Sequence, residues 1–229
     1  ELDAAKQTMS PESYAQEFEC SFQAGISGSY YGKTIEELEE KGNVKNFDID
    51  DNLEVETWWD LGMNDSTVIT FAQRHNDEVR IIDCYENAGE GLEHYLNVID
   101  SKPYNYSKHI APHDIRVREI GTNKSRWETA KEMGLEFDIA PKLSVEDGIE
   151  QVRRMLPKCY FHKNNCKKLV EALKSYCKRW DEKNNCFRNK PLHNWASHFA
   201  DSIRYGAVTE PIERSDWNTP IHVDTNYIV

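Results

Sequence analysis

The chain has 229 residues, of which 38% are hydrophobic and 30% charged, the composition of an ordinary globular protein rather than a disordered or fibrous one. Its longest apolar runs fall far short of the roughly 20 residues that cross a bilayer, and no basic-then-apolar signal segment opens the chain. The net charge of −12 argues against a protein that coats nucleic acid nonspecifically. We therefore expect a cytosolic protein without a membrane-spanning segment, with one domain or a domain plus a subdomain.

Charge is distributed unevenly along the chain. The first sixty residues are rich in acids, whereas residues 153–190 are dominated by Lys and Arg and contain only Glu171, Asp181 and Glu182 as acids. Such a basic stretch would attract phosphates, although a solvated helix face explains it about as well. The asymmetry alone decides nothing about function.

The six cysteines are too sparse for a disulfide scaffold, so we expect reduced thiols. Four of them, Cys159, Cys166, Cys177 and Cys186, fall within one stretch near His162. A zinc site is conceivable there, but the spacing matches none of the recurring zinc patterns. We favour ordinary thiols over a zinc site.

The first half of the chain predicts helices followed by strands. A Ser-Pro-Glu start predicts a helix over residues 10–22, and a short acidic helix follows over residues 34–41. Residues 54–60, 67–72 and 79–85 are rich in β-branched and aromatic residues and are separated by turn residues. These three strands predict an antiparallel meander.

The second half alternates helices with strands. Periodicity and capping signals predict helices over residues 90–100, 125–133, 144–156, 169–180 and 195–207, and strands over residues 108–112 and 137–140. This alternation implies right-handed crossovers and parallel strands. The predicted fold class is therefore α/β, a mixed sheet with three antiparallel strands and then parallel strands, flanked by helices on both faces.

Three dispersed aspartates carry the chemistry. Asp60 lies in the first strand, and Asp114 lies at the end of the fourth strand, which should lie beside the first. Asp201 lies in the last helix, one turn after His198. Three carboxylates that converge without a basic partner repel one another unless Mg²⁺ or Mn²⁺ binds between them. Any single aspartate is more often a cap, a turn residue or a surface charge, and Asp65 is an evident turn candidate.

Several segments resemble motifs of the nuclease domain in tailed-bacteriophage terminase large subunits. Residues 58–67 (WWDLGMNDST) are similar to its first motif. Residues 111–115 (APHDI) are similar to its second motif, a strand that ends in an acidic residue. Residues 191–205 (PLHNWASHFADSIRY) are similar to the motif in its C-terminal helix. Residues 121–126 (GTNKSR) and 140–149 (APKLSVEDGI) also fit. The resemblance covers most of the chain, from about residue 14 to residue 205.

This resemblance implies a ribonuclease H-like fold and two-metal cleavage of concatemeric viral DNA during genome packaging. It implies three ligands for two Mg²⁺ or Mn²⁺ ions, namely Asp60, Asp114 and Asp201. Asp65 and His198 would support them, with Asp65 aiding the second metal and His198 near the scissile phosphate. The DNA-contact candidates are Lys124, Arg126 and Lys142.

The family's full protein carries an ATPase ahead of the nuclease, and the sequence contains no Gly-x4-Gly-Lys-[Ser/Thr] loop. We therefore expect a nuclease portion alone, divided into a junction helix and loop (1–45), the nuclease domain (46–209) and a polar tail (210–229). The implied partners are double-stranded DNA, the ATPase domain, the small terminase subunit and the portal, in the host cytoplasm. Asn194 and Ser202 stand where relatives often carry Asp and Ala.

Two other functions stay open on sequence grounds. Another ribonuclease H-like enzyme, such as a junction resolvase or a transposase core, would share the metal ligands but prefer branched or end-specific DNA. A non-catalytic module that docks on a portal would leave the aspartates inert. Fold-level analogy alone does not separate these functions.

Overall fold

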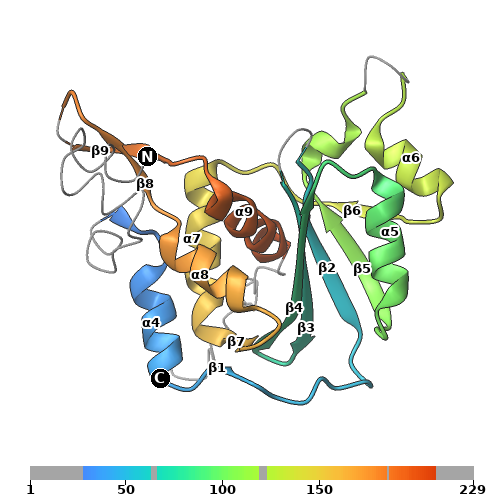
Figure 1. The fold of residues 1–229 in the computed structure, drawn as a ribbon, viewed down its shortest axis with the longest axis horizontal. Coiled ribbons are helices and arrows are strands. Elements are labelled where there is room, and N and C mark those ends of the chain that lie inside the picture. Colours follow the sequence, from blue (N-terminus) through green and yellow to red (C-terminus); the bar gives the residue numbers. More distant parts are fainter. Residues whose placement is uncertain (1–27, 63–65, 119–122, 185, 210–229) are drawn as a thin grey trace, which may run out of the picture.

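A computed structural model describes residues 28–62, 66–118, 123–184 and 186–209 (Figure 1). The helix predicted over residues 10–22, the polar tail predicted over 210–229, and Asp65 lie outside the described residues. Within the described part of the chain, no helix combines the length and the apolar character needed to cross a membrane.

A seven-stranded mixed sheet forms the centre of the fold, in the order β1-β7-β4-β3-β2-β5-β6. Only β3 runs antiparallel to its neighbours β2 and β4, and the other pairs are parallel. The strands are β1 (Val44–Lys45), β2 (Val55–Asp60), β3 (Ser66–His75), β4 (Glu78–Ala88), β5 (Tyr106–Ala111), β6 (Phe137–Ile139) and β7 (Cys159–His162). The predicted fold class is confirmed, and β5 pairs with β2 as the strand order requires.

Helices cover both faces of the sheet (Figure 1). One face carries α4 (Gly32–Glu40), α7 (Val145–Met155), α8 (Lys167–Ser175) and α9 (Trp195–Val208), whereas the other carries α5 (Leu92–Ser101) and α6 (Arg126–Glu132). Because successive strand residues point to opposite faces, Trp58 enters the first core and Trp59 the second. Both indoles are fully buried, so the site strand is anchored on both sides.

The turns and caps of the sequence prediction are also present. Asn76, in the β3–β4 turn, has a φ of 53°, and Gly134, after α6, has a φ of 91°. Ser125 caps α6 in a capping box, and the Ser144 hydroxyl accepts a hydrogen bond from the backbone N–H of Asp147 at the start of α7.

Two segments differ from the sequence prediction. The helix predicted over residues 169–180 ends at Ser175, because the next backbone groups pair elsewhere: the Tyr176 carbonyl accepts from Tyr30 N at 2.9 Å. A two-stranded hairpin of β8 (Lys178–Asp181) and β9 (Cys186–Pro191) follows. The short buried strand β7, preceded by the 3-10 turn η3 (Leu156–Lys158), was not predicted at all.

The N-terminal described segment belongs to the same core. Ile35 and Leu38 of α4 are fully buried in the first core, and β1 pairs with β7. These residues fall within the stretch predicted as a junction. The division of the chain at residue 45 stays a prediction.

Candidate active site

The candidate site lies at the edge of the sheet where its parallel strands end. β2 ends at Asp60, and β5, its parallel neighbour, ends at Ala111. Asp114 belongs to the 3-10 turn η2 (His113–Arg116) just beyond, rather than to the strand end that the sequence predicted. Crevices outside the carboxyl ends of strands are where open α/β sheets bind ligands.

Helix α9 lies against this edge because its residues fit closely onto β2. A Cβ at Gly206 would lie 2.0 Å from a ring atom of Trp58, so only glycine allows this approach. Ser202 Oγ donates to the Trp58 carbonyl at 2.8 Å and lies 2.7 Å from Thr70 Oγ1. Ser202 thus joins α9 to β2 and β3.

Arg74 of β3 also stabilises the contact between α9 and β2. Its guanidinium lies 5.1 Å from the Trp58 ring, pairs with Glu56 at 3.0 Å and donates to the Gly206 carbonyl at 2.8 Å. At the other end of α9, Asn194 Oδ1 accepts from Ala196 N at 3.0 Å and caps the helix. Asn194 therefore provides the N-terminal cap of α9.

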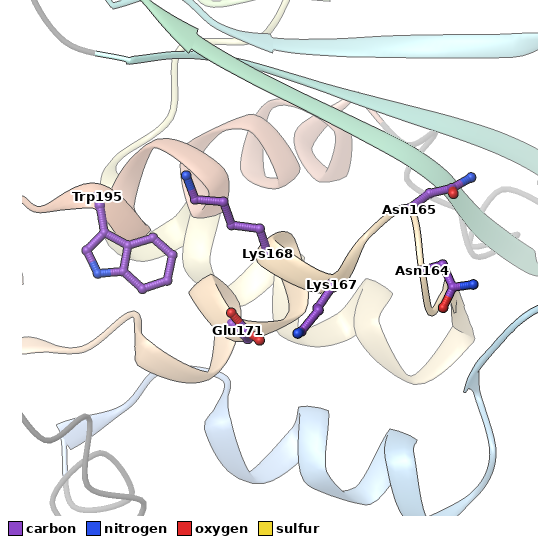
Figure 2. A pocket seen from close by; sticks show the side chains of 6 residues that line it. All are labelled: Asn164, Asn165, Lys167, Lys168, Glu171 and Trp195. Carbon is purple, nitrogen blue, oxygen red and sulfur yellow. The ribbon is translucent and has the colours of Figure 1, made fainter.

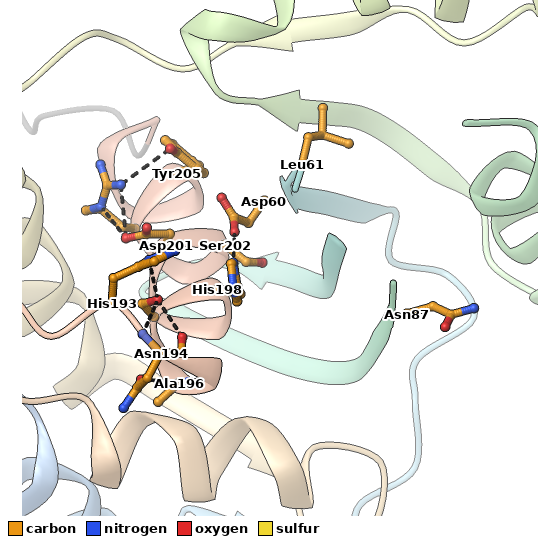
Figure 3. A network of polar contacts seen from close by, with 12 residues as sticks. Asp60, Leu61, Asn87, His193, Asn194, Ala196, His198, Asp201, Ser202 and Tyr205 are labelled. Carbon is orange, nitrogen blue, oxygen red and sulfur yellow. Dashed lines mark hydrogen bonds and ion pairs between the residues drawn. The ribbon is translucent and has the colours of Figure 1, made fainter. Parts of the chain in front are cut away.

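Asp60 and His198 form the centre of the site. His198 Nδ1 lies 3.0 Å from Asp60 Oδ2, and the side chains are only 11% and 15% exposed (Figure 3). Burial raises the pKa of Asp60 to about 6; the hydrogen bond to His198 opposes this rise, and the charge of Asp201 adds to it. Asp60 and Asp201 are therefore close enough to influence each other electrostatically.

Asp201 has a basic partner, which corrects the expectation of three carboxylates without one. Arg204, one turn later on α9, approaches Asp201 Oδ1 with Nε at 3.1 Å and Nη2 at 3.0 Å. Burial opposes the charge of Arg204, yet Asp201 and Tyr205 raise its pKa, so Arg204 stays cationic. The i,i+3 spacing of Asp201 and Arg204 on a helix was the signal in the sequence that predicts this pair.

The pKa of the Tyr205 hydroxyl is affected by the charges of all three aspartates. Burial raises the pKa of the Tyr205 hydroxyl; Arg204 opposes the rise, and Asp201, Asp60 and Asp114 all add to it. Asp114 is exposed, and no side chain among the described residues forms a hydrogen bond with it. The fold thus brings Asp60, Asp201 and His198 together and leaves Asp114 at the rim.

Among the described residues, no three His, Cys, Asp or Glu side chains are close enough to enclose one ion. Each of the two central carboxylates nevertheless has one oxygen in use and one without a partner in this part of the chain. Asp60 uses Oδ2 toward His198, and Asp201 uses Oδ1 toward Arg204. Their other oxygens, Asp60 Oδ1 and Asp201 Oδ2, remain able to bind a cation.

The cysteine stretch has a packing role in the structure. Cys159 Sγ donates to the Met155 carbonyl and Cys166 Sγ to the Ile81 carbonyl, both at 3.4 Å. Both thiols are buried, whereas Cys186 is exposed on β9.

The three predicted DNA-contact residues lie on different parts of the site edge. Arg126 Nη1 donates to the carbonyl of Leu61, the residue after Asp60, at 3.0 Å. Lys142 is exposed in the loop that follows β6 at the same edge of the sheet. Lys124 is exposed and paired with Glu132 at 2.7 Å.

No protein-family model matches the chain. The terminase large subunit of Escherichia phage T5 is 23% identical over 218 residues, which cover 90% of this chain and 47% of that protein. The chain therefore spans about half the length of this curated relative.

Solved structures of terminase nuclease domains share the fold. The large terminase nuclease domain of bacteriophage SPP1, with bound Mn, superposes with a TM-score of 0.51 and 15% identity, over 66% of this chain and 84% of that one. The large terminase nuclease of the thermophilic phage G20c, with bound magnesium, gives 0.53 and 10% identity, over 80% of this chain and 97% of that one. The resemblance inferred from the sequence motifs is confirmed: the chain is similar in sequence to a phage terminase large subunit and has the ribonuclease H-like fold of terminase nuclease domains.

Proposed function

We propose that the chain is a metal-dependent endonuclease that cleaves double-stranded, concatemeric viral DNA during genome packaging. The observation that carries this proposal is the closeness of Asp60, at the end of β2, to Asp201 on α9, each contacted through one oxygen by a neighbouring basic side chain. Partly buried carboxylates that a neighbouring side chain orients in this way are typical of metal sites rather than of solvated surfaces.

The donor set fits a hard divalent cation. Mg²⁺ and Mn²⁺ prefer carboxylate oxygens, and Asp60 Oδ1 and Asp201 Oδ2 would hold the ion, with Asp114 as the third ligand and Asp65 aiding a second ion. When bound, a pair of such ions activates a water and stabilises the leaving oxygen of a phosphodiester. The nucleases of phage SPP1 with bound Mn and of phage G20c with bound magnesium support this choice of cation.

The protein's own residues prepare this donor set. His198 fixes the orientation of the Asp60 carboxylate, and Arg204 does the same for Asp201. Because burial and Asp201 raise the pKa of Asp60 to about 6, Asp60 is mainly a carboxylate above that pH and mainly protonated below it. Cation binding should therefore weaken as the pH falls below about 6.

DNA would lie along the same sheet edge. Lys142, Arg126 and Lys124 are our candidates for contacts with phosphates on the α6 side of the site. Since the metal ions act on the backbone, we expect little intrinsic sequence specificity. Within a complete terminase, the partners would be the ATPase domain, the small subunit and the portal.

Plasmid cleavage in Mn²⁺ or Mg²⁺ tests this function. We expect cleavage to require the cation and to be lost in Asp60→Ala and Asp201→Ala, whereas Asp77→Ala, which changes an exposed carboxylate on the β3–β4 turn, should retain it. Undiminished cleavage by both site variants would refute the proposal. A strong preference for a four-way junction over linear and supercoiled DNA would instead indicate a resolvase-type enzyme.

A further inference from the structure

A pocket outside the proposed metal site lies where α8 begins. It has a volume of about 520 Å³ and is lined by Asn164, Asn165, Lys167, Lys168, Glu171 and Trp195 (Figure 2). Pockets of this size hold small ligands. We call it the Trp195 pocket.

The Trp195 pocket adjoins the α9 side of the candidate active site. Trp195 is the first residue of α9, three residues before His198 and six before Asp201, which is roughly 9 Å along a helix axis. Asn164 and Asn165 follow the end of β7, where Phe161 lies level with Glu56 of β2, four residues before Asp60. The pocket and the site residues His198 and Asp201 therefore share helix α9.

An exposed aromatic ring and two lysines line this pocket. Trp195 is 40% exposed, an unusual state for a large apolar side chain, and its ring lies 6.1 Å from that of Phe199. Lys168 Nζ lies 5.6 Å from the same Phe199 ring, so Trp195 and Lys168 flank a common neighbour.

One ammonium group of the pocket is available to an anion. Lys167 is exposed and has no carboxylate partner among the described residues, whereas Lys168 pairs with Glu86. Glu171 is the one acid in the lining, opposite two lysines. Ammonium groups that follow a phosphate backbone, next to an aromatic face on which a base stacks, characterise sites for unpaired nucleic acid.

We infer that the Trp195 pocket binds a nucleotide of unpaired DNA, with its base stacked on Trp195 and its phosphate on Lys167. This inference rests on the proposed nuclease function, which supplies a DNA end beside α9. Asn164, whose exposed amide can both donate and accept, would contact the sugar or the base edge. The pocket would hold one strand of a frayed or newly cut end close to the metal site.

Fluorescence anisotropy with a labelled single-stranded oligothymidine, in EDTA and at low ionic strength, tests this inference without relying on cleavage. Trp195→Ala should weaken binding by about 5- to 100-fold, the range measured for one base stacked on an aromatic side chain. Lys167→Ala should also reduce the slope of log affinity against log salt by about 0.7, the value for one phosphate contact on a single strand.

Matched variants provide the controls. Trp180→Ala removes a tryptophan that is 36% exposed on β8, and Lys33→Ala removes an exposed lysine on α4. Both should bind the oligothymidine as the wild type does. A blunt duplex should bind equally well to Trp195→Ala and to the wild type, because it offers no unpaired base.

The outcomes separate this inference from the proposed function. Wild-type binding of oligothymidine by Trp195→Ala and Lys167→Ala would overturn the pocket assignment even if plasmid cleavage is observed, and would leave this face to a protein partner. An equal loss on the blunt duplex would contradict the stacking of an unpaired base. If Asp60→Ala leaves cleavage intact while Trp195→Ala still loses oligothymidine binding, the metal site is refuted and the pocket stands.

Discussion

The two sides of the candidate active site differ in how far their aspartates are buried and hydrogen-bonded. On the α9 side, Asp60 and Asp201 are mostly buried, and His198 and Arg204 lie within hydrogen-bonding distance of them. On the η2 side, Asp114 is exposed and forms no side-chain hydrogen bond within the described part of the chain. The α9 side is therefore oriented before any cation binds, whereas the η2 side would be ordered by the cation itself.

This difference predicts which substitutions change both stability and cleavage and which change cleavage alone. Changes on the α9 side should alter both the free energy of unfolding and cleavage, because the site residues there are part of the core. Changes on the η2 side should alter cleavage alone. Four substitutions would break or sharpen this contrast.

The largest effect is expected for Gly206→Ala on the α9 side. Alanine normally stabilises a helix interior, but here its Cβ would lie 2.0 Å from a ring atom of the fully buried Trp58. We expect the free energy of unfolding to fall by about 3 kcal/mol, as for an overpacked core, and cleavage to fall with it. Urea denaturation measures the loss. Gly91→Ala, where a Cβ meets nothing within 4 Å, is the control, and an equal effect there would contradict the close-packing account.

Asp114→Ala should separate the two sides most clearly. Because Asp114 is exposed, we expect the free energy of unfolding to stay within about 0.5 kcal/mol of the wild type. Loss of a metal ligand should nevertheless lower Mn²⁺-dependent cleavage by about a hundredfold. Parallel urea and cleavage measurements check this prediction. Full activity in the variant would remove Asp114 from the ligand set.

Asp60→Asn should stabilise the protein in EDTA while abolishing cleavage. The pKa of Asp60 is raised from 3.8 to about 6, so the folded state loses stability as the pH rises through that window and the carboxylate becomes charged. Asparagine avoids this loss, and we expect a gain of about 1–2 kcal/mol above pH 7 that shrinks towards pH 4. Thermal unfolding in EDTA across this pH range measures it. A variant that is less stable than the wild type at pH 8 would contradict the assigned pKa shift.

The smallest effect is expected for Lys142→Ala on the exposed edge. Folding should be unchanged, because Lys142 is exposed in the loop between β6 and α7. Affinity for duplex DNA should fall only a few-fold, and the slope of log affinity against log salt should shrink by about 0.9, the value for one phosphate contact. Titrations at several salt concentrations test this, with Lys33→Ala on α4 as the control. An unchanged slope would exclude Lys142 from the DNA path.

Much of the fold could be predicted from the sequence because its signals are local. The β-branched runs of β2, β3 and β4, the glycine after α6 and the serine caps each determine their element through nearby residues. Strand-helix alternation then placed β5 beside β2. Those steps were sufficient to bring Asp60 and Asp114 to one edge of the sheet.

The remainder depends on contacts between residues far apart in the sequence. The apolar pattern of α8 continues past Ser175, and only the pairing of Tyr176 with Tyr30 shows that the helix ends there. β7 is four residues long and becomes a strand only between β1 and β4. The close approach of Gly206 to Trp58 likewise requires the packed structure. Arg204 could have been predicted, because its spacing from Asp201 is helical.

The most direct test of the metal site is a crystal of the chain soaked in Mn²⁺ at neutral pH, measured at a wavelength where manganese scatters anomalously. The proposed function predicts anomalous peaks bonded to Asp60 Oδ1 and Asp201 Oδ2, with Asp114 drawn in as a further ligand. His198 and Arg204 should keep their contacts with the other oxygens. Soaked crystals with no manganese between Asp60 and Asp201, or with manganese bound only elsewhere, would contradict it.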